Sequence, residues 1–485
     1  MKFGIERLLA DPALRAPLEG KRVALLAHPA SVTADLTHSL DALSSCPGIT
    51  LSAAFGPQHG LKGDKQDNMM ETPDEVDPRL GIPVFSLYGE VRRPSGQMMS
   101  TFDVVLVDLQ DLGCRIYTFV TTLLYMLEAA AEHGKAVWVL DRPNPAGRPV
   151  EGTILLPGWE SFVGAGPMPM RHGMTLGEMG RWFIDHFELD VDYRVIAMDG
   201  WQPETAPGFG WPGDRAWINP SPNAPNLNMA RAYAGTVMLE GTTLSEGRGT
   251  TRPLELFGAP DIDARAVISV MRDLAPQWLT GCTLRDISFE PTFHKHVGQL
   301  CSGVHIHAEG DAYDHQAFKP WRVQALGFKA IRSLFPHYDL WRDFPYEYAF
   351  GKLPIDVING GPGLREWVDN PAAGPDDLYL DAYRLIQEGD QYASAGQAEL
   401  GRQRYADAEG AAARPRCRGD PLCAGVPIGQ AWRRLVVAPA RRAHGRAGER
   451  RRDAGEHLRG TLAPDVHRRR GDRPVGRQHG PDEPY

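Results

Sequence analysis

The chain has 485 residues, of which 42% are hydrophobic and 23% are charged, and its formal net charge is −9. These proportions are ordinary for a globular protein, and the length allows two or three domains with sizeable cores. No stretch approaches the ~20 consecutive apolar residues of a membrane helix, and no long apolar segment of a signal peptide stands near the start. The six cysteines are scattered without a Cys-x-x-Cys pair, which argues against a zinc ribbon or a disulfide framework. We therefore expect a cytoplasmic protein.

Alternating apolar and amphipathic segments fill the first two hundred residues. Apolar runs predict strands over residues 22–28, 50–56, 82–89, 102–111, 136–145 and 192–198. Helical spacing covers residues 118–134 and 175–189, and Thr175 with Glu178 makes a capping box at the start of the second helix. Strands that alternate with helices favour a parallel sheet covered by helices. We predict a Rossmann-like α/β domain over residues 1–210.

Polar residues gather where the predicted strands end. The loop FGPQHGLKGDKQDN, residues 55–68, combines charges with glycines, and His59 and Asp64 are its candidates for contact with a ligand. Carboxyl ends of parallel strands share one sheet edge, where ligands bind in open α/β folds. A tight turn with solvated charges is the structural alternative. Neither a Gly-x-Gly-x-x-Gly after the first strand nor a P-loop occurs, so we expect no nucleotide and no other cofactor.

Two further strand ends carry candidate sugar-binding residues. The segment DLQDLGCRIY contributes Asp108, Gln110, Asp111, Arg115 and Tyr117, and the segment DRPNP contributes Asp141 and Asn144. Carboxylates, amides and a phenol together suit a site that binds the hydroxyl and amide groups of a sugar. Structural alternatives stay open, because Arg115 can pair with an aspartate and the two prolines can fix a rigid turn.

Residues 200–228 are dense in proline, glycine and tryptophan, and they interrupt the alternation. We interpret them as the crossing into a smaller α+β domain over residues 211–400. The segment EGTTLSEGRGT of that domain supplies Glu240, Glu246 and Arg248 as candidates for a site between the two domains. Before the crossing, His172 precedes a predicted helix N-terminus, where it can either bind an anionic ligand or cap the helix.

Two histidine pairs, at 294/296 and 305/307, have a spacing that places both rings on one face of a strand. Some zinc sites use such pairs, but a third ligand is lacking nearby in the sequence. We therefore interpret both pairs as sheet surface and expect no metal. The motifs Gly-x-Ser-x-Gly and His-Glu-x-x-His are absent, which argues against serine hydrolases and zincins.

The segment 401–485 differs in composition from the rest of the chain. It holds 19 arginines, no lysine and 10 acidic residues, whereas residues 1–400 hold 33 basic and 51 acidic residues. The acidic body argues against binding to nucleic acid. Two interpretations of the segment stay open: a disordered basic arm for nucleic acid or a membrane, or translation of a GC-rich gene in a shifted frame. We expect neither a nucleic-acid nor a membrane partner.

Seven motifs, taken in order, resemble those of the exo-β-N-acetylmuramidases (NamZ-like glycoside hydrolases, formerly a domain of unknown function). They are FGPQHGLKGDKQDN, GIPVFSLYG, DVVLVDLQDLGCRIYTF, VLDRPNPAGRPVEG, SFVG followed by RHGMTLGE, NPSPN, and EGTTLSEGRGTTRPLELFGAP. The resemblance runs from about residue 20 to 390. It implies a Rossmann-like domain, a smaller C-terminal domain and a cleft between them. It also implies release of terminal N-acetylmuramic acid from peptidoglycan fragments in cell-wall recycling, without metal or nucleotide.

The resemblance also points to catalytic residues, and here the chain departs from the family pattern. The family loop usually contains Gly-Pro-Glu-His-Gly, in which the glutamate is the leading catalytic candidate, and Gln58 stands at that position beside His59. An amide cannot donate a proton as a carboxylic acid does. Three alternatives follow: another carboxylate acts (Asp64, Asp111 or Glu246), the N-acetyl group of the substrate acts as nucleophile, or the protein acts on a different substrate or only binds a muropeptide or other carbohydrate.

Substrate-binding candidates follow from the same motifs. Asn219 and Asn223 belong to NPSPN, and Glu240 opens the last motif. The lactyl carboxylate of N-acetylmuramic acid calls for a guanidinium, which matches a carboxylate in two-point contact. Arg115, Arg171 and Arg248 are the candidates for that contact.

Overall fold

The computed structural model describes residues 1–63, 65, 70–202, 211–347 and 349–378. The segment 401–485 and the end of the domain expected over residues 211–400 lie outside the described residues. Contacts between Cα atoms place all the described residues in one unit of the chain, Met1–Ala438. Within these ranges, every helix is too short or too polar to span a membrane.

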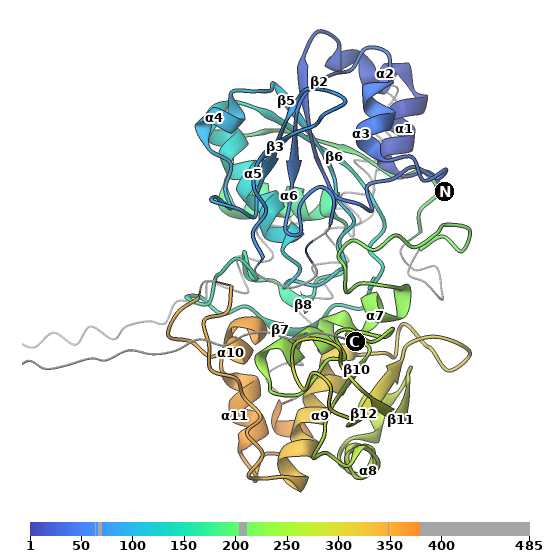
Figure 1. The fold of residues 1–485 in the computed structure, drawn as a ribbon, viewed down its shortest axis with the longest axis vertical. Helices are drawn as coiled ribbons and strands as arrows, with labels where there is room; N and C mark the ends of the chain where they lie inside the picture. The colour runs from blue at the N-terminus through green and yellow to red at the C-terminus, as the bar shows by residue number, and fades with distance from the viewer. Residues whose placement is uncertain (64, 66–69, 203–210, 348, 379–485) are drawn as a thin grey trace, which may run out of the picture. The chain divides into compact units, whose positions relative to one another are not determined.

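A seven-stranded sheet occupies the first half of the chain (Figure 1). Its strands stand in the order β3-β4-β2-β1-β5-β6-β9, and all neighbours run parallel except β3 and β4. The strands are β1 Arg22–Ala27, β2 Thr50–Gly56, β3 Glu75–Val76, β4 Pro83–Ser86, β5 Val104–Asp108, β6 Ala136–Leu140 and β9 Asp192–Ile196. Both β5 and β6 are buried at every residue, as a parallel sheet covered on both faces requires. The predicted α/β class with a parallel central sheet is confirmed.

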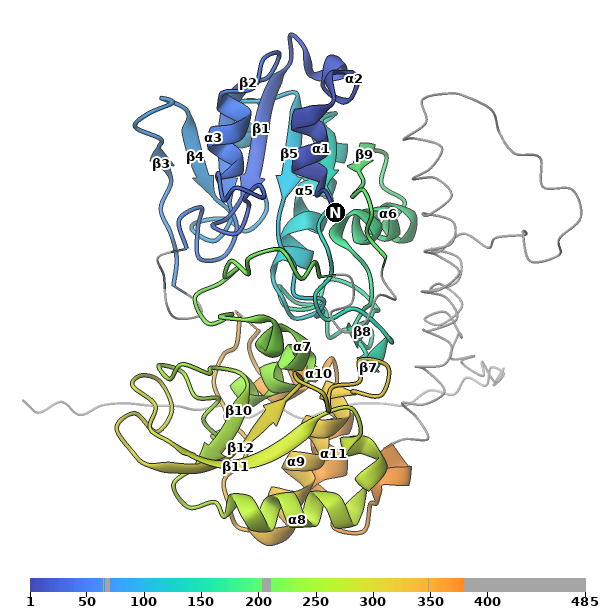
Figure 2. The same cartoon turned by 90° about the vertical axis from the view of Figure 1, so that its right-hand side faces the viewer.

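Helices cover both faces of this sheet (Figure 2). Successive residues of a strand point to opposite faces: Leu25 of β1 packs in one buried cluster with Ile5 of α1, and Leu26 packs in another with Leu123 of α5. Helices α1 and α3 therefore lie on one face, and α4, α5 and α6 lie on the other. The helices are α1 Gly4–Ala10, α2 Pro12–Arg15, η1 Ala16–Leu18, α3 Ser39–Ser44, α4 Gly96–Met99, α5 Phe119–His133 and α6 Leu176–Phe187.

The ends of α5 and α6 follow local sequence rules. Helix α5 ends at Gly134, whose φ of 60° is left-handed and favours glycine. The capping box expected at the start of α6 is present, because the Thr175 hydroxyl accepts from the Glu178 N–H and the Glu178 carboxylate accepts from the Thr175 N–H. Such ends fix where each helix meets the loops at the sheet edge.

The second half of the chain holds a three-stranded antiparallel sheet in the order β10-β12-β11. Val304 of β12 packs in one buried cluster with Ile268 of α8 and Leu326 of α9. The elements are β10 Leu256–Ala259, β11 Thr283–Phe289, β12 Cys301–His307, α7 Leu227–Thr236, η2 Val237–Gly241, α8 Ala264–Leu274, η3 Pro276–Leu279, α9 Pro320–Leu334, α10 Pro354–Asn359 and α11 Gly363–Asp369. A two-stranded ribbon, β7 Glu151–Ile154 and β8 Pro169–Arg171, comes earlier in the chain.

Buried polar contacts join the two halves. The guanidinium of Arg115, which follows β5, donates to the carbonyl oxygen of Ile358 in α10 at 3.0 Å. The carboxylate of Glu151 in β7 accepts from the backbone N–H groups of Trp321 and Arg322 at 3.1 Å each. A carboxylate at this position stabilises the N-terminus of α9. These contacts hold the loops at the carboxyl edge of the large sheet against the second half of the chain.

Candidate active site

A pocket with an empty volume of about 460 Å³, part of it open to solvent, lies where residues of both halves meet. From the first half it is lined by the loop after β2 and by the segment that leads into α5, with Gln58, His59, Tyr117 and Thr118 as polar groups. From the second half its polar groups are Ser221, Asn223, Tyr233, Glu240, Arg248, Tyr346 and Glu347.

Gln58 is fixed in this pocket through both ends of its amide. Its carbonyl oxygen accepts from the Thr118 hydroxyl at 2.7 Å, and its nitrogen donates to Oε1 of Glu347 at 3.3 Å. The other carboxyl oxygen of Glu347, Oε2, accepts from the Tyr88 hydroxyl at 2.8 Å. The amide and the carboxyl group therefore form one hydrogen-bonded unit.

Glu347 is a carboxyl group suited to hold a proton near neutral pH. Burial raises the pKa of Glu347 to about 7; the Tyr88 hydrogen bond opposes this rise, and the charge of Glu240 adds to it. The backbone of Glu347 has φ 43°, a left-handed value that is uncommon outside glycine. Strained backbone of this kind concentrates at functional sites, where the surrounding structure enforces it.

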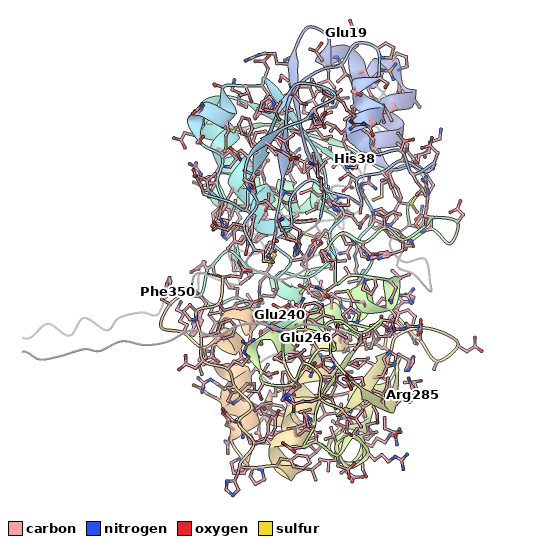
Figure 3. All side chains as sticks on the ribbon, viewed as in Figure 1. Glu19, His38, Glu240, Glu246, Arg285 and Phe350 are labelled. Carbon is pink, nitrogen blue, oxygen red and sulfur yellow. The ribbon has the colours of Figure 1, made fainter. Side chains whose placement is uncertain are left out.

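A buried ion network lies beside this pair. Arg248 donates to Glu240 at 2.6 Å through Nη2 and to Glu246 at 2.7 Å through Nε. The Tyr346 hydroxyl donates to the second oxygen of Glu240 at 2.5 Å. Figure 3 labels Glu240, which belongs to η2, and Glu246, and the two lie close to each other. Glu240 thus presents a carboxylate to the pocket with both of its oxygens oriented.

Glu246 lies behind the pocket and is held in its charged form. Burial alone would raise its pKa, but Lys295 at 2.7 Å, His294 at 3.4 Å and Arg248 together hold the pKa well below its usual range. A carboxylate so strongly paired is a poor proton donor. Its position orients Arg248, which in turn orients Glu240.

His59 and Tyr117 complete the wall of the first half. His59 has φ 69°, and its Nδ1 donates to the carbonyl oxygen of Lys65 at 2.8 Å. The ring of Tyr117 packs edge-on against the ring of Tyr233, with centroids 6.0 Å apart, and burial raises the pKa of the Tyr117 phenol. Gly56 permits the tight loop, because a Cβ there would lie 2.5 Å from the backbone nitrogen of Leu61.

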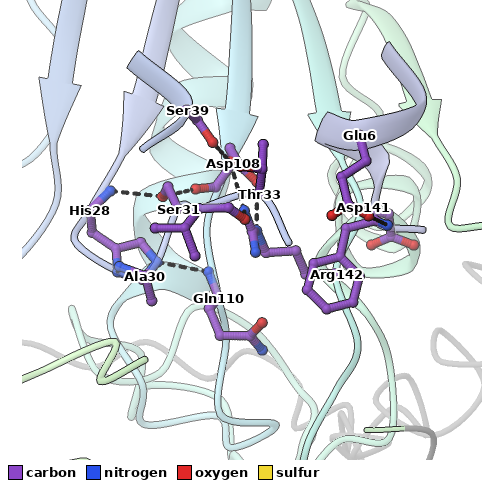
Figure 4. Close-up of polar contacts among 12 residues, drawn as sticks. Glu6, His28, Ala30, Ser31, Thr33, Ser39, Asp108, Gln110, Asp141 and Arg142 are labelled. Carbon is purple, nitrogen blue, oxygen red and sulfur yellow. Dashed lines mark hydrogen bonds and ion pairs between the residues drawn. The ribbon is translucent and has the colours of Figure 1, made fainter. Parts of the chain in front are cut away.

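Asp108 and Gln110 lie outside this pocket, in the network that Figure 4 shows. Arg142 donates to the two carboxylate oxygens of Asp108 at 2.6 and 2.9 Å, and both side chains are buried. The amide of Gln110 donates to the carbonyl oxygens of Asp111 and Pro143. These contacts occupy the Asp108 carboxylate and the Gln110 amide nitrogen, and they tie the ends of β5 and β6 together.

We predict that Asp108→Asn lowers the free energy of unfolding by about 3–5 kcal/mol, because it leaves the Arg142 cation buried without its partner charge. Chemical denaturation measures the loss. Asp103→Asn is the control, since its partner Arg22 is largely exposed and the loss should be much smaller. An unchanged stability together with lost substrate binding would instead place Asp108 in the site.

Four other candidates also form contacts that hold loops. The Asp111 carboxylate accepts from the Gly113 N–H at 2.7 Å and faces Nε2 of His172 at 3.3 Å. Asp141 accepts from the Thr175 hydroxyl and the Gly177 N–H, which ties β6 to the start of α6. Asn144 accepts from two backbone N–H groups and donates to the Met174 carbonyl oxygen. None of the four lines the pocket that the described residues form.

Two of the three arginine candidates for the lactyl carboxylate also hold loops, and one lines the pocket. Arg115 is fully buried and donates to the carbonyl oxygens of Thr153, Met168 and Ile358. Arg171 is buried and donates to the Phe318 carbonyl oxygen at 3.1 Å. Of the three guanidinium candidates, Arg248 is the one that lines the pocket.

The remaining two candidates are Asn219, which is exposed and is not among the residues that line the pocket, and Asp64, which lies outside the described residues. Among the residues that are described, no group of three or more His, Cys, Asp or Glu side chains is placed to hold a metal ion. The rings of His305 and His307 do lie together, with centroids 3.8 Å apart, and Arg285 donates to both. A cation in that position disfavours a metal.

Sequence reasoning missed Glu347, Tyr346, Tyr88 and Thr118. The segment FPYEYAFGKLP, residues 344–354, carried a weak signal, because one acidic residue stands there between aromatic residues. The decisive features, a left-handed φ and a partner 289 residues away, are not visible in a sequence.

The chain matches known proteins along most of its length. The family model described as exo-β-N-acetylmuramidase NamZ, N-terminal, matches residues 23–228, and its C-terminal counterpart matches residues 231–380. The peptidoglycan β-N-acetylmuramidase NamZ of Bacillus subtilis strain 168 is 40% identical over 372 residues, which are 76% of this chain and 84% of that protein.

Two crystal structures of DUF1343 family proteins from Bacteroides fragilis share the fold. The first has a TM-score of 0.67 at 28% identity and covers 80% of this chain and 97% of its own. The second has a TM-score of 0.62 at 24% identity and covers 81% of this chain and 98% of its own.

Proposed function

Because the chain belongs to the NamZ family of exo-β-N-acetylmuramidases, we propose that it releases terminal N-acetylmuramic acid from peptidoglycan fragments. The terminal sugar occupies the pocket that Gln58, Glu240 and Glu347 line. We place this pocket between a domain over residues 1–210 and a domain over residues 211–400. Peptidoglycan-derived sugars or muropeptides are the partners, and cytoplasmic cell-wall recycling is the setting that we propose.

One observation carries the proposal: a carboxyl group that holds its proton near neutral pH lines the same pocket as an oriented carboxylate. Glu347, with a pKa raised to about 7 by burial, is the first, and Glu240 is the second. Glycoside hydrolysis commonly requires such a pair, one group as acid and the other to support positive charge at the reacting carbon.

In the reaction, Glu347 gives its proton to the glycosidic oxygen while the bond from that oxygen to the anomeric carbon breaks. The electrons of the bond stay with the leaving sugar, and Glu240 supports the positive charge that develops on the terminal sugar. A water molecule then adds its hydroxyl group to the anomeric carbon, and its proton restores the acid form of Glu347.

Gln58 acts in this scheme as a positioning residue. Its nitrogen donates to Glu347, and its oxygen accepts from Thr118, so it fixes the direction of the carboxyl group. A glutamine at the position where the family usually has glutamate is therefore compatible with hydrolysis, because the proton comes from Glu347. We retain Arg248, His59, Tyr117 and Asn223 as substrate contacts, with Arg248 for the lactyl carboxylate.

We expect the full chain to release N-acetylmuramic acid from the disaccharide MurNAc–GlcNAc. The reversed disaccharide, GlcNAc–MurNAc, is the control and should remain intact because its terminal sugar lacks the lactyl group. Mass spectrometry of the products measures both reactions. Cleavage inside longer glycan chains, or binding of the disaccharide by folded protein without any cleavage, would contradict the proposal.

A further inference from the structure

We propose that a second, more open groove beside Glu347 binds the leaving sugar, an uncharged N-acetylglucosamine, so that the bond to be cut lies at Glu347. This inference rests on the proposed function. The groove has an empty volume of about 830 Å³, part of it open to solvent, and its wall includes Arg92, Tyr125, Phe162 and Glu347.

Glu347 belongs to the walls of both the pocket and the groove. A carboxyl group that protonates a glycosidic oxygen must lie where two neighbouring sugars join, since that oxygen links them. A side chain that lines two adjoining spaces meets this requirement. The two spaces therefore suit the two sugars on either side of the bond.

The difference in exposure between the two spaces sets the direction of the substrate. The residues that line the pocket are buried, except the half-buried Ser221, whereas Glu90 and Glu160 at the rim of the groove are exposed. A buried pocket can take only a chain end, while an open groove lets the rest of the glycan continue into solvent. This arrangement predicts removal of one terminal sugar at a time.

Aromatic rings form one wall of the groove. The ring of Phe162 packs against those of Tyr88 and Tyr125, with centroids 5.7 and 6.0 Å apart, and the guanidinium of Arg92 lies 4.0 Å from the centroid of Tyr88. Phe162 and Tyr125 line the groove. A sugar ring has an apolar face of C–H groups that packs on such rings, and the rings lose little conformational entropy on binding.

The charge at the rim selects the class of sugar. Besides Glu347, the charged residues that line the groove are three acidic ones, Glu71, Glu90 and Glu160, and one basic one, Arg92, so the rim is acidic. An acidic rim repels the lactyl carboxylate of a muramic acid but accepts hydrogen bonds from the hydroxyl groups of an uncharged sugar. N-acetylglucosamine, which alternates with N-acetylmuramic acid in peptidoglycan, is uncharged and fits this rim.

Phe162→Ala tests the groove with two substrates that share the terminal sugar. One is MurNAc–GlcNAc, and the other is the β-glycosyl fluoride of N-acetylmuramic acid, whose leaving group is a single atom. We expect kcat/KM for the disaccharide to fall roughly tenfold more than kcat/KM for the fluoride, since the stacking is lost only for the disaccharide. Phe187→Ala, on the solvent-exposed end of α6, is the control and should leave both values unchanged.

Tyr125→Ala, at a half-buried position, gives the same test if Phe162→Ala fails to fold. In addition, free N-acetylglucosamine should inhibit the wild type and should inhibit either variant less. Equal losses for both substrates, or no loss for the disaccharide, would overturn the assignment of the groove. Failure of the wild type to hydrolyse either substrate would instead overturn the proposed function, and this inference with it.

Discussion

Glu347→Gln is expected to lower kcat for MurNAc–GlcNAc by roughly 10²–10⁴-fold, the range that positioned general acids contribute. The substitution keeps the size of the side chain and the acceptor for the Tyr88 hydroxyl, but it removes the proton that the leaving sugar needs. The glycosyl fluoride should suffer a much smaller loss, because fluoride leaves with little need for protonation. Stopped assays of both substrates under saturating conditions measure the two values.

The pH profile of the wild type gives an independent check of this assignment. An acid must carry its proton to act, so kcat/KM should fall as the pH rises through about 7, the value to which burial raises the pKa of Glu347. In Glu347→Gln this alkaline fall should disappear for the fluoride. An unchanged alkaline limb in the variant, or equal losses for the two substrates, would show that another group supplies the proton.

Gln58→Glu is the matched variant for the amide beside Glu347. It replaces a hydrogen-bond donor at 3.3 Å with a second carboxyl group, and two adjacent carboxyl groups resist ionising together. The alkaline limb should therefore move to higher pH. If the alkaline limb of the pH profile did not move, Gln58 would not contact the Glu347 carboxyl group when the protein is in solution.

The fold was predictable because its signals are local. The strands β5 and β6 are continuous apolar runs, which a sheet buried on both faces requires, and the cap at Thr175 lies within four residues of sequence. A strand end also predicts the edge at which ligands bind. The place of Gln58, His59 and Tyr117 in the pocket was predictable by that rule, because each of them comes after the end of a strand.

The sequence did not predict which polar residues line the pocket and which ones hold loops in place. Asp108 and Arg115 have the composition of ligand contacts, yet Arg142 and three distant carbonyl groups occupy them. Whether a carboxylate faces a ligand or a buried cation depends on partners that are remote in sequence. Glu347 shows the opposite case, because its burial, its left-handed φ and its contacts with Gln58 and Tyr88 are what distinguish it from a surface glutamate.

Glu240→Gln is expected to lower kcat/KM for the disaccharide by at least roughly 10²-fold, since its carboxylate is the group that supports positive charge on the terminal sugar. Thermal unfolding must first show that the variant is folded, because Arg248 loses a charged partner at 2.6 Å. Tyr346→Phe is the milder comparison, since it removes only the hydroxyl group that donates to Glu240 at 2.5 Å.

Glu240→Gln should also move the alkaline limb of the pH profile to lower pH. The negative charge of Glu240 contributes to the raised pKa of Glu347, after burial, so removing that charge lets Glu347 lose its proton more easily. Glu240→Asp separates the effect of the charge from the effect of its position. Because aspartate keeps the negative charge, the alkaline limb should return to its wild-type pH. Because the shorter side chain does not extend to the terminal sugar, kcat/KM should stay low. If Glu240→Gln lowered the rate without moving the limb, Glu240 would act on the sugar but not on Glu347. If it changed neither, the second carboxylate of the reaction would have to be sought elsewhere in the pocket.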